Sequence, residues 1–298
     1  MRNTGRARAF AAAVTPLTAG GARVDAPAVE ALADFYGGAG LDGLLVLGTT
    51  GEGVLRSLDD RRLVAERFVI AGNQRLEIIV HCGAQSTRDT AELAEHAATL
   101  GSGGIAVIAP PYYALDERSL VRHFVAAATA CAPAPFYIYE FAARSGYAVP
   151  LSVIAEVRER CANLIGLKVS DHPFDKVEPY LLNGLDVFIG AEDLIHAGLH
   201  RGAAGAVSGL AAALPELTVR AVRTGTPEDS HTAGVMRAAI QRFPFHAALK
   251  RILRHRGIAI EPAVSAPLRD LDRDEVEELE RLVPPLIERA VRESPSPP

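Results

Sequence analysis

The residue best suited to covalent chemistry in this sequence is Lys168, near the end of the apolar run 163–170 (Asn-Leu-Ile-Gly-Leu-Lys-Val-Ser). Of 31 basic residues only Lys168, Lys176 and Lys250 are lysine, so a composition that favours arginine has an amine here. Arginine cannot lose its proton or form an imine at neutral pH, whereas a desolvated lysine can do both. The simpler interpretation is a strand-end lysine whose ammonium reaches solvent.

Polar side chains follow the other apolar runs in a similar way. They are Thr49, Thr50, Tyr112, Tyr113, Tyr139, Arg144, Glu192, Asp193 and Ser208. An amine, phenols, hydroxyls and an arginine are the groups that imine chemistry needs, because the amine attacks a keto carbon and a phenol moves the protons. The segment 48–51 (Gly-Thr-Thr-Gly) can bind a carboxylate, since its glycines let consecutive backbone N–H groups turn inward.

The elements that must position these residues form a regular series. Eight strand-like runs alternate with segments of helical periodicity. The runs are 10–14, 43–47, 77–81, 104–108, 135–139, 164–168, 186–189 and 205–208. Strict alternation predicts parallel strands with right-handed crossovers, and eight units favour a closed (β/α)8 TIM barrel. In such a barrel the residues that follow the strands meet at one mouth.

The strand-like pattern ends near residue 224. We therefore expect a barrel carrying the active site over 1–224, an all-helical C-terminal extension over 225–292, and a disordered tail over 293–298. Within the extension, 231–256 and 272–292 are predicted to be amphipathic helices. In the strand that carries the lysine, alternation predicts that Leu164, Gly166 and Lys168 share one face, opposite Ile165, Leu167 and Val169.

Composition excludes several classes of function. The chain has 298 residues, is 49% hydrophobic and carries a net charge of −5, so no basic surface suggests a nucleic acid or membrane partner. No apolar segment is long enough to span a bilayer, and the run 10–14 is too short for a secretory signal. Three dispersed cysteines in apolar surroundings predict reduced thiols in a cytoplasmic protein.

Six motifs together resemble the dihydrodipicolinate synthase/N-acetylneuraminate lyase family of class I pyruvate-dependent aldolases, over the whole chain. Any one of these motifs alone would be weak evidence, but the set is specific. The motifs are Gly-Thr-Thr-Gly-Glu at 48–52, Gly-Ala-Gln-Ser-Thr at 83–87, Pro-Tyr-Tyr at 111–113, Tyr139 with Arg-Ser-Gly at 144–146, Gly-Leu-Lys at 166–168 and Gly-Ala-Val-Ser-Gly at 205–209.

The resemblance implies a lyase that makes or breaks a carbon–carbon bond between pyruvate, or another 2-keto acid, and an aldehyde, with no cofactor and no metal. Lys168 would carry the Schiff base and Tyr139 the proton. Thr49, together with Tyr113 from a neighbouring subunit, would complete a proton relay. The family is typically a homotetramer, a dimer of dimers. The implied substrate-binding residues are Gly48, Thr50, Arg144, Glu192, Asp193, Val207 and Ser208.

Details of the motifs point to different partners. Arg144 matches the arginine that the synthases use for a carboxylated second substrate, whereas Glu192 and Asp193 resemble the acidic pair with which the lyases bind a sugar-like chain. The chain departs from the family pattern at Glu140 and Ala142, and from the synthase pattern at Val169 and Ala212. An aldolase or lyase is therefore the leading hypothesis. The alternatives are 4-hydroxy-tetrahydrodipicolinate synthase, which condenses pyruvate with aspartate semialdehyde, and a non-catalytic keto-acid-binding protein.

Three residue assignments have simpler alternatives. Glu192 and Asp193 could instead complement the dipole of the helix that follows them. Arg144 could form an ion pair with Glu140 rather than bind substrate. His196 and His200 have the i, i+4 spacing of metal ligands, but the sequence shows no third ligand, so we expect no metal site.

Overall fold

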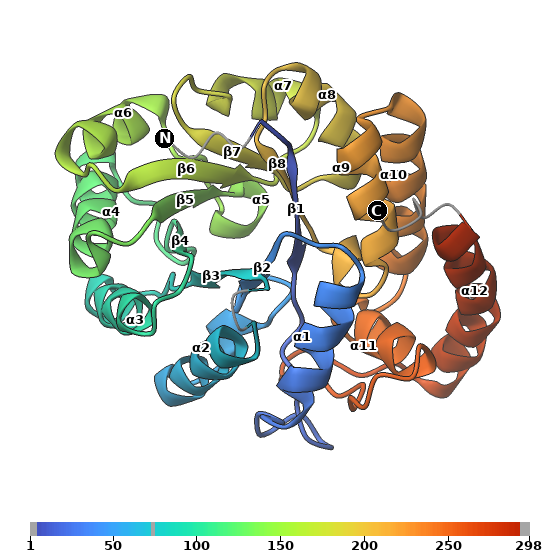
Figure 1. Cartoon of the computed structure of the whole chain (residues 1–298). Coiled ribbons are helices and arrows are strands. Elements are labelled where there is room, and N and C mark those ends of the chain that lie inside the picture. Colours follow the sequence, from blue (N-terminus) through green and yellow to red (C-terminus); the bar gives the residue numbers. More distant parts are fainter. Residues whose placement is uncertain (1–4, 73–74, 293–298) are drawn as a thin grey trace.

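A computed structural model describes residues 5–72 and 75–292, in which eight parallel strands close into a barrel in sequence order (Figure 1). The barrel closes because β1 (Arg8–Ala12) pairs with both β2 (Gly43–Val46) and β8 (Gly205–Ser208). The predicted fold class is confirmed. The predicted tail, 293–298, lies outside the described residues.

The other strands are β3 (Glu77–His81), β4 (Gly104–Ile108), β5 (Phe136–Glu140), β6 (Leu164–Val169) and β7 (Asp186–Ile189). The helices between strands are α1 (Ala28–Gly38), α2 (Leu58–Gly72), α3 (Thr87–Thr99), α4 (Glu117–Cys131), α5 (Ala142–Ser145), α6 (Leu151–Arg160), α7 (Phe174–Val177) and α8 (Ile195–His200). Four 3-10 turns are η1 (Gly53–Leu55), η2 (Glu178–Tyr180), η3 (Glu192–Leu194) and η4 (Leu210–Ala212). After the barrel strands come α9 (Pro215–Thr224), α10 (Pro227–Gln241), α11 (Phe245–His255) and α12 (Arg273–Arg292).

The strands are buried on both faces, which explains why they read as continuous apolar runs. One set of side chains fills the barrel interior, and a larger set packs between the strands and the helices. The interior set is Phe10, Ala12, Leu45, Ile79, Ala106, Tyr137, Phe188 and Val207. Burial of these apolar surfaces is the main force that holds the helices on the barrel.

Local sequence signals set where several helices begin. Ser86, Asp116 and Thr226 precede α3, α4 and α10, and each side-chain oxygen accepts a hydrogen bond from a backbone N–H in the first turn. These bonds satisfy donors that have no partner within the helix. Within residues 5–72 and 75–292, no helix has both the length and the apolar character needed to cross a bilayer.

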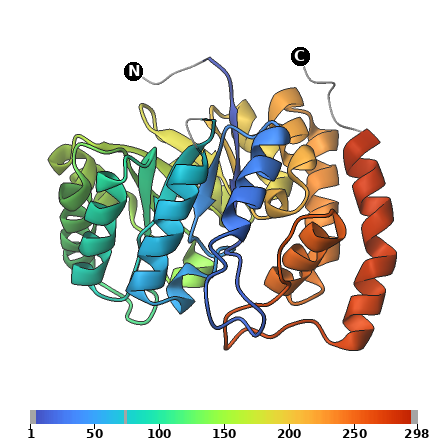
Figure 2. The ribbon, with the colours of Figure 1, turned by 60° about the horizontal axis from the view of Figure 1, so that its bottom comes forward.

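The predicted single helix over 231–256 is wrong. The structure has two helices there, α10 and α11, and Pro244 stands between them as the residue before α11. A proline has no backbone N–H and therefore cannot continue the hydrogen bonding of α10. Both helices and α12 lie on one side of the barrel, and α12 is the outermost (Figures 1 and 2).

The predicted alternation along β6 is wrong at its beginning. The pairing with β5 shifts by one residue, because Phe136 pairs with Leu164 while Tyr137 pairs with Gly166. Such a bulge places one extra residue, Ile165, in β6. Leu164 therefore packs with Leu167 on the outer face, and Ile165 packs against the interior set. The prediction for Lys168 is unaffected because the bulge precedes it.

Candidate active site

Lys168 lies at the C-terminal end of β6 and is 92% buried, with a relative exposure of 8%. Its Nζ atom is 4.2 Å from the centroid of the Tyr139 ring, and these two residues are paired in the register of β5 and β6. Among the described residues, no carboxylate or carbonyl lies within hydrogen-bonding distance of Nζ. The Lys168 side chain is thus largely buried, and its amine is not bound in an ion pair within the part of the chain described.

The phenol of Tyr139 is connected to the loop that follows β2. Its hydroxyl oxygen is 3.2 Å from Oγ1 of Thr49, within hydrogen-bonding distance, and its side chain is buried. Either hydroxyl can be the donor, so a proton can pass in either direction along this bond. The structure therefore brings together three residues predicted from the sequence, Lys168, Tyr139 and Thr49.

The loop of residues 47–53 turns tightly, which brings backbone groups close together. Leu47 and Glu52 have φ angles of 61° and 57°, in the left-handed region that residues other than glycine seldom adopt. Gly53 is required because an added Cβ would lie 1.9 Å from the carbonyl oxygen of Leu47. Thr50, which is 7% exposed, and Gly48 lie within this turn, as the sequence predicts.

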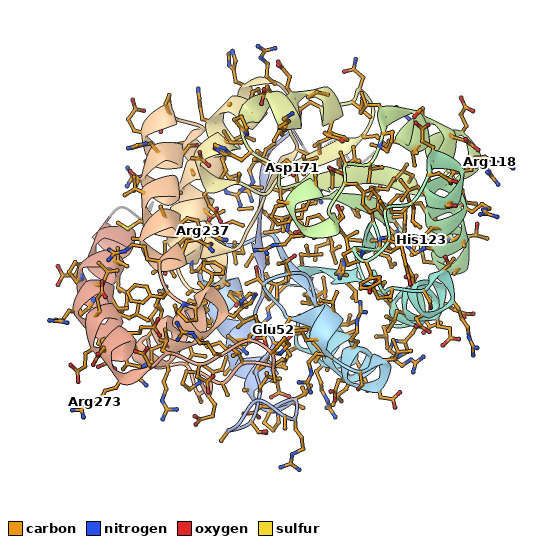
Figure 3. The ribbon with its side chains drawn as sticks, turned by 180° about the vertical axis from the view of Figure 1, so that it is seen from behind. Glu52, Arg118, His123, Asp171, Arg237 and Arg273 are labelled. Carbon is orange, nitrogen blue, oxygen red and sulfur yellow. The ribbon has the colours of Figure 1, made fainter. Side chains whose placement is uncertain are left out.

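Residues of the C-terminal helices hold this loop in place. His246 of α11 has its Nε2 3.0 Å from the carbonyl oxygen of Thr49, so Nε2 carries the proton of that bond. Lys250, also on α11, donates to Glu52 over 2.6 Å, and both side chains are fully buried (Figure 3 labels Glu52). The helical extension therefore positions a segment of the active site rather than only covering the barrel.

A neutral histidine forms one wall beside Tyr139. The ring of His81 contacts that of Tyr139 edge to face, with centroids 5.9 Å apart. Burial, and then the nearby charge of Arg61, lowers the pKa of His81 to about 3, so the imidazole is uncharged at neutral pH. Its Nδ1 lies 3.1 Å from the carbonyl oxygen of Leu47, which can only accept, so Nδ1 carries the proton.

Glu192 and Ser208 bind each other at the ends of β7 and β8. The Ser208 hydroxyl donates to Oε1 of Glu192 over 2.7 Å, and the backbone N–H of Leu210 donates to the same oxygen over 3.0 Å. The Ser208 oxygen accepts in turn from Ala211 and Thr218. Both residues are buried, so these contacts fix the turn after β8. Val207, which precedes this turn, belongs to the barrel interior.

Two cavities open on the barrel at opposite ends. The larger, of about 1260 Å³, lies at the N-terminal ends of the strands and contains none of the predicted site residues. The smaller, of about 610 Å³, lies between α10 and the loops that follow β6 and β7. Its wall includes Ser170, two residues after Lys168, and both predicted acidic residues, Glu192 and Asp193. Lys168, Tyr139 and Thr49 do not line the smaller cavity, but it lies at the same end of the strands as these residues.

A scan against known protein families matches residues 6–285 to the family described as "Dihydrodipicolinate synthetase family". The chain belongs to this family. The match covers nearly the whole described chain, so the family resemblance predicted from the motifs is confirmed.

Relatives of the chain support a lyase within this family. An uncharacterized DapA-like lyase of Halobacterium salinarum is 35% identical over 257 residues, covering 81% of this chain and 82% of its own. The structure of YagE of E. coli K12 in complex with pyruvate is 25% identical, with a TM-score of 0.86 and coverage of 94% and 98%. N-acetylneuraminate lyase of Proteus mirabilis is 28% identical, with a TM-score of 0.85 and coverage of 95% and 98%. This member of the family is a lyase.

Two of the predicted site residues, Tyr113 and Asp193, are exposed in the single chain. Tyr113 follows β4 and is 72% exposed, with its ring 4.8 Å from that of Tyr112. Asp193 is 46% exposed in its side chain, and its Oδ2 lies 2.9 Å from Nε2 of His172. Neither observation assigns a role. Among the described residues, no group of three histidine, cysteine or acidic side chains is arranged to hold a metal.

The alternative ion pair between Arg144 and Glu140 does not form in the part of the chain described. Arg144 lies on α5 with its guanidinium carbon 5.7 Å from the centroid of the Phe141 ring, and its side chain is exposed. Glu140 is buried and accepts instead from the backbone N–H of Val149 over 2.9 Å. Arg144 is therefore available to a ligand at the mouth of the barrel.

The raised pKa of Glu140 leads us to expect that the stability of the protein depends on pH. Burial, together with the neighbouring carboxylate of Asp171, raises its pKa to about 8 from an ordinary 4.5. The folded state then keeps a proton that the unfolded chain loses above pH 4.5. The stabilisation is complete below that pH and is lost as the pH rises through 8.

The Glu140→Gln variant cannot titrate at this position. We expect wild type to lose about 1 to 3 kcal/mol of unfolding free energy relative to the variant between pH 5 and pH 8.5. Urea unfolding at the two pH values measures this difference. Glu156 is an exposed residue of α6, and the Glu156→Gln variant is the control. Between the two pH values it should lose as much unfolding free energy as wild type does. An equal gap between wild type and Glu140→Gln at both pH values would contradict the assignment.

Proposed function

We propose that this lyase is a class I aldolase that makes or breaks a carbon–carbon bond between pyruvate, or another 2-keto acid, and an aldehyde, through an imine on Lys168. The observation that carries the proposal is the largely buried Lys168, whose amine lies 4.2 Å from the ring centroid of Tyr139, while the Tyr139 phenol reaches Thr49. The pyruvate in the YagE complex supports the choice of keto acid. The chemistry needs no cofactor, since the amine itself serves as the electrophilic catalyst once the imine forms.

In the proposed mechanism each residue has one task. The unprotonated amine of Lys168 attacks the keto carbon and gives a carbinolamine, and Tyr139 protonates the departing hydroxyl so that water leaves and the imine forms. The phenolate of Tyr139 left by that step takes a proton from the methyl carbon of the imine and gives an enamine. The enamine attacks the aldehyde carbon, the new alkoxide takes this proton back from Tyr139, and water then hydrolyses the imine to release the product and restore the amine. Thr49 passes protons to and from Tyr139. Thr50 and the backbone N–H groups of the 48–51 turn bind the keto-acid carboxylate.

We also propose roles for the remaining predicted residues. Glu192 and Ser208 hold the turn after β8, and we propose that they shape the site indirectly. Arg144 binds the partner of pyruvate. Tyr113, exposed in a single copy, completes the proton relay of a neighbouring subunit in a homotetramer, which would bury its ring. An aldehyde with a sugar-like chain would reach Asp193 across the smaller cavity.

Reductive trapping tests the imine. With pyruvate and borohydride, we expect a stable adduct on the peptide that contains Lys168, because reduction of the imine makes the bond to nitrogen permanent. Peptide mass spectrometry locates it. The other two lysines are internal controls, since Lys176 is exposed and Lys250 is bound in a buried ion pair. An unmodified Lys168, or an equal yield on Lys176, would overturn the mechanism.

A further inference from the structure

Arg237 of α10 is held in one orientation beside the barrel mouth. Its guanidinium carbon lies 3.7 Å from the centroid of the Phe245 ring, and Nε and Nη2 donate to Oε1 of Gln241 over 3.1 and 2.8 Å. The two contacts fix the plane of the guanidinium and leave Nη1 as its outer end. Figure 3 places Arg237 on the side of α10 that faces the barrel.

The free end of Arg237 reaches the residues of the proposed site. An added Cβ on Gly209 would lie 2.3 Å from Nη1 of Arg237 and 3.3 Å from Oγ1 of Thr50, so both groups flank the same point after β8. Glycine at 209 therefore lets the guanidinium approach the backbone beside the turn that we propose binds the keto acid. Arg237 also lines the cavity of about 610 Å³.

The charge of Arg237 is only partly balanced. Its nearest carboxylate oxygen is Oε1 of Glu192, 3.7 Å from Nη1, and that oxygen already accepts closer hydrogen bonds from Ser208 and Leu210. No other described residue accepts a hydrogen bond from Nη1. Two of its N–H donors therefore remain for a ligand.

A second arginine adds to this charge. The pKa of Arg237 is lowered chiefly by burial, and the neighbouring charge of Arg144 lowers it further. The charge of Glu192 acts in the opposite direction and raises this pKa, so the carboxylate offsets part of the charge of Arg237. His172 and Asp193, on the opposite wall, bind each other. An anionic group on a ligand would stabilise the guanidinium of Arg237 and accept from the Nη1 donors that have no acceptor among the described residues.

We propose that Arg237 binds an anionic group, a carboxylate or a phosphate, on the aldehyde partner of the keto acid. The inference rests on the proposed aldolase function and narrows its substrate class to acidic aldehydes. Arginine suits the task because its planar donors can hold two oxygens of a carboxylate or phosphate at once.

Matched pairs of aldehydes test this inference. Condensation with pyruvate is measured for glyceraldehyde 3-phosphate against glyceraldehyde, and for succinic semialdehyde against butanal. Arg237→Met keeps an apolar stem on Phe245 and removes the charge. We expect it to lower kcat/KM for the anionic aldehyde by about 10- to 100-fold, mainly through KM, because a charged hydrogen bond is lost. The neutral aldehyde should change by less than about twofold.

Three comparisons make the result decisive. Arg242→Met, the same change at an exposed ion pair at the end of α10, should leave both pairs unchanged. Arg237→Lys should keep part of the preference for anionic over neutral aldehydes that Arg237→Met loses. If Arg237→Met lowers kcat/KM for the anionic aldehyde of only one pair, the charged group of that aldehyde, carboxylate or phosphate, is the natural one. Equal losses on charged and neutral aldehydes, or a wild type that prefers the neutral ones, overturn the inference.

Borohydride trapping of pyruvate separates this inference from the proposed function. Arg237→Met should retain the adduct on Lys168, since the imine forms before the aldehyde binds. If wild type forms the adduct but the variant loses no discrimination, the anion site is wrong and the aldolase stands. If wild type forms no adduct, the proposed function fails and the inference fails with it.

Discussion

Replacing Tyr139 with phenylalanine is expected to lower kcat by about 10²- to 10⁴-fold, the usual contribution of a positioned acid or base. The change keeps the aromatic ring beside Nζ of Lys168 but removes the hydroxyl that reaches Thr49. Proton transfer should therefore fail while the pocket persists. Steady-state kinetics with pyruvate and an aldehyde measure the loss, and slow borohydride trapping on Lys168 should remain detectable.

Tyr137 offers a matched control on the same strand. It lies two residues before Tyr139, is equally buried, and packs edge to face on Phe188 in the barrel interior, with ring centroids 6.2 Å apart. Tyr137→Phe removes the same atom from a position that faces no proposed reacting group. We expect its kcat to stay within about threefold of wild type, well short of the effect of an acid or base. Similar losses in the two variants would mean that the Tyr139 hydroxyl acts only through packing.

The barrel could be predicted from the sequence because each of its strands is a short apolar run. In a parallel sheet covered on both faces, burial alone selects such runs, and the helices between them show a separate period. Four of the predicted strands, 77–81, 104–108, 186–189 and 205–208, match the structure at both ends. The others differ by one or two residues at one end or at both, where frayed hydrogen bonds carry little sequence signal.

Two local features escaped prediction for different reasons. The division of 231–256 had a visible signal, because Pro244 cannot donate the hydrogen bond that a continuous helix needs. The extra residue in β6, Ile165, had none, because a bulge depends on how two strands pair and both strands are apolar.

The site could be predicted only where the barrel geometry determines it. Lys168 and Tyr139 lie at the C-terminal ends of β6 and β5, Thr49 follows β2, and the C-terminal ends of parallel strands meet at one mouth. Arg237 and His246 also approach this site, but they come from α10 and α11, and their position depends on how those helices dock on the barrel. The hydrophobic periodicity of a helix shows which of its faces is buried, but it does not show where on the barrel that face packs.

Removing one charge of the buried Glu52–Lys250 ion pair is expected to lower the stability of the protein by a large amount. Both side chains are fully buried, and Glu52 accepts from Nζ of Lys250 over 2.6 Å and from the backbone N–H of Ser265 over 2.6 Å. Lys250→Met leaves the carboxylate buried without its counter-charge. We expect it to lower the free energy of unfolding by about 3 to 5 kcal/mol, measured by urea denaturation.

The next residue along α11 supplies the control for this prediction. Arg251 pairs with Glu280 at the surface, with side chains 30% and 44% exposed, so Arg251→Met should cost less than about 1 kcal/mol. Replacing Glu52 and Lys250 together with apolar residues should cost less than Lys250→Met alone, since no charge is then left buried. A loss in Lys250→Met no larger than in Arg251→Met would show that Glu52 gains water or a proton instead. The link between α11 and the 48–53 turn would then be weaker than its geometry indicates, and the positioning of Thr49 would depend on His246.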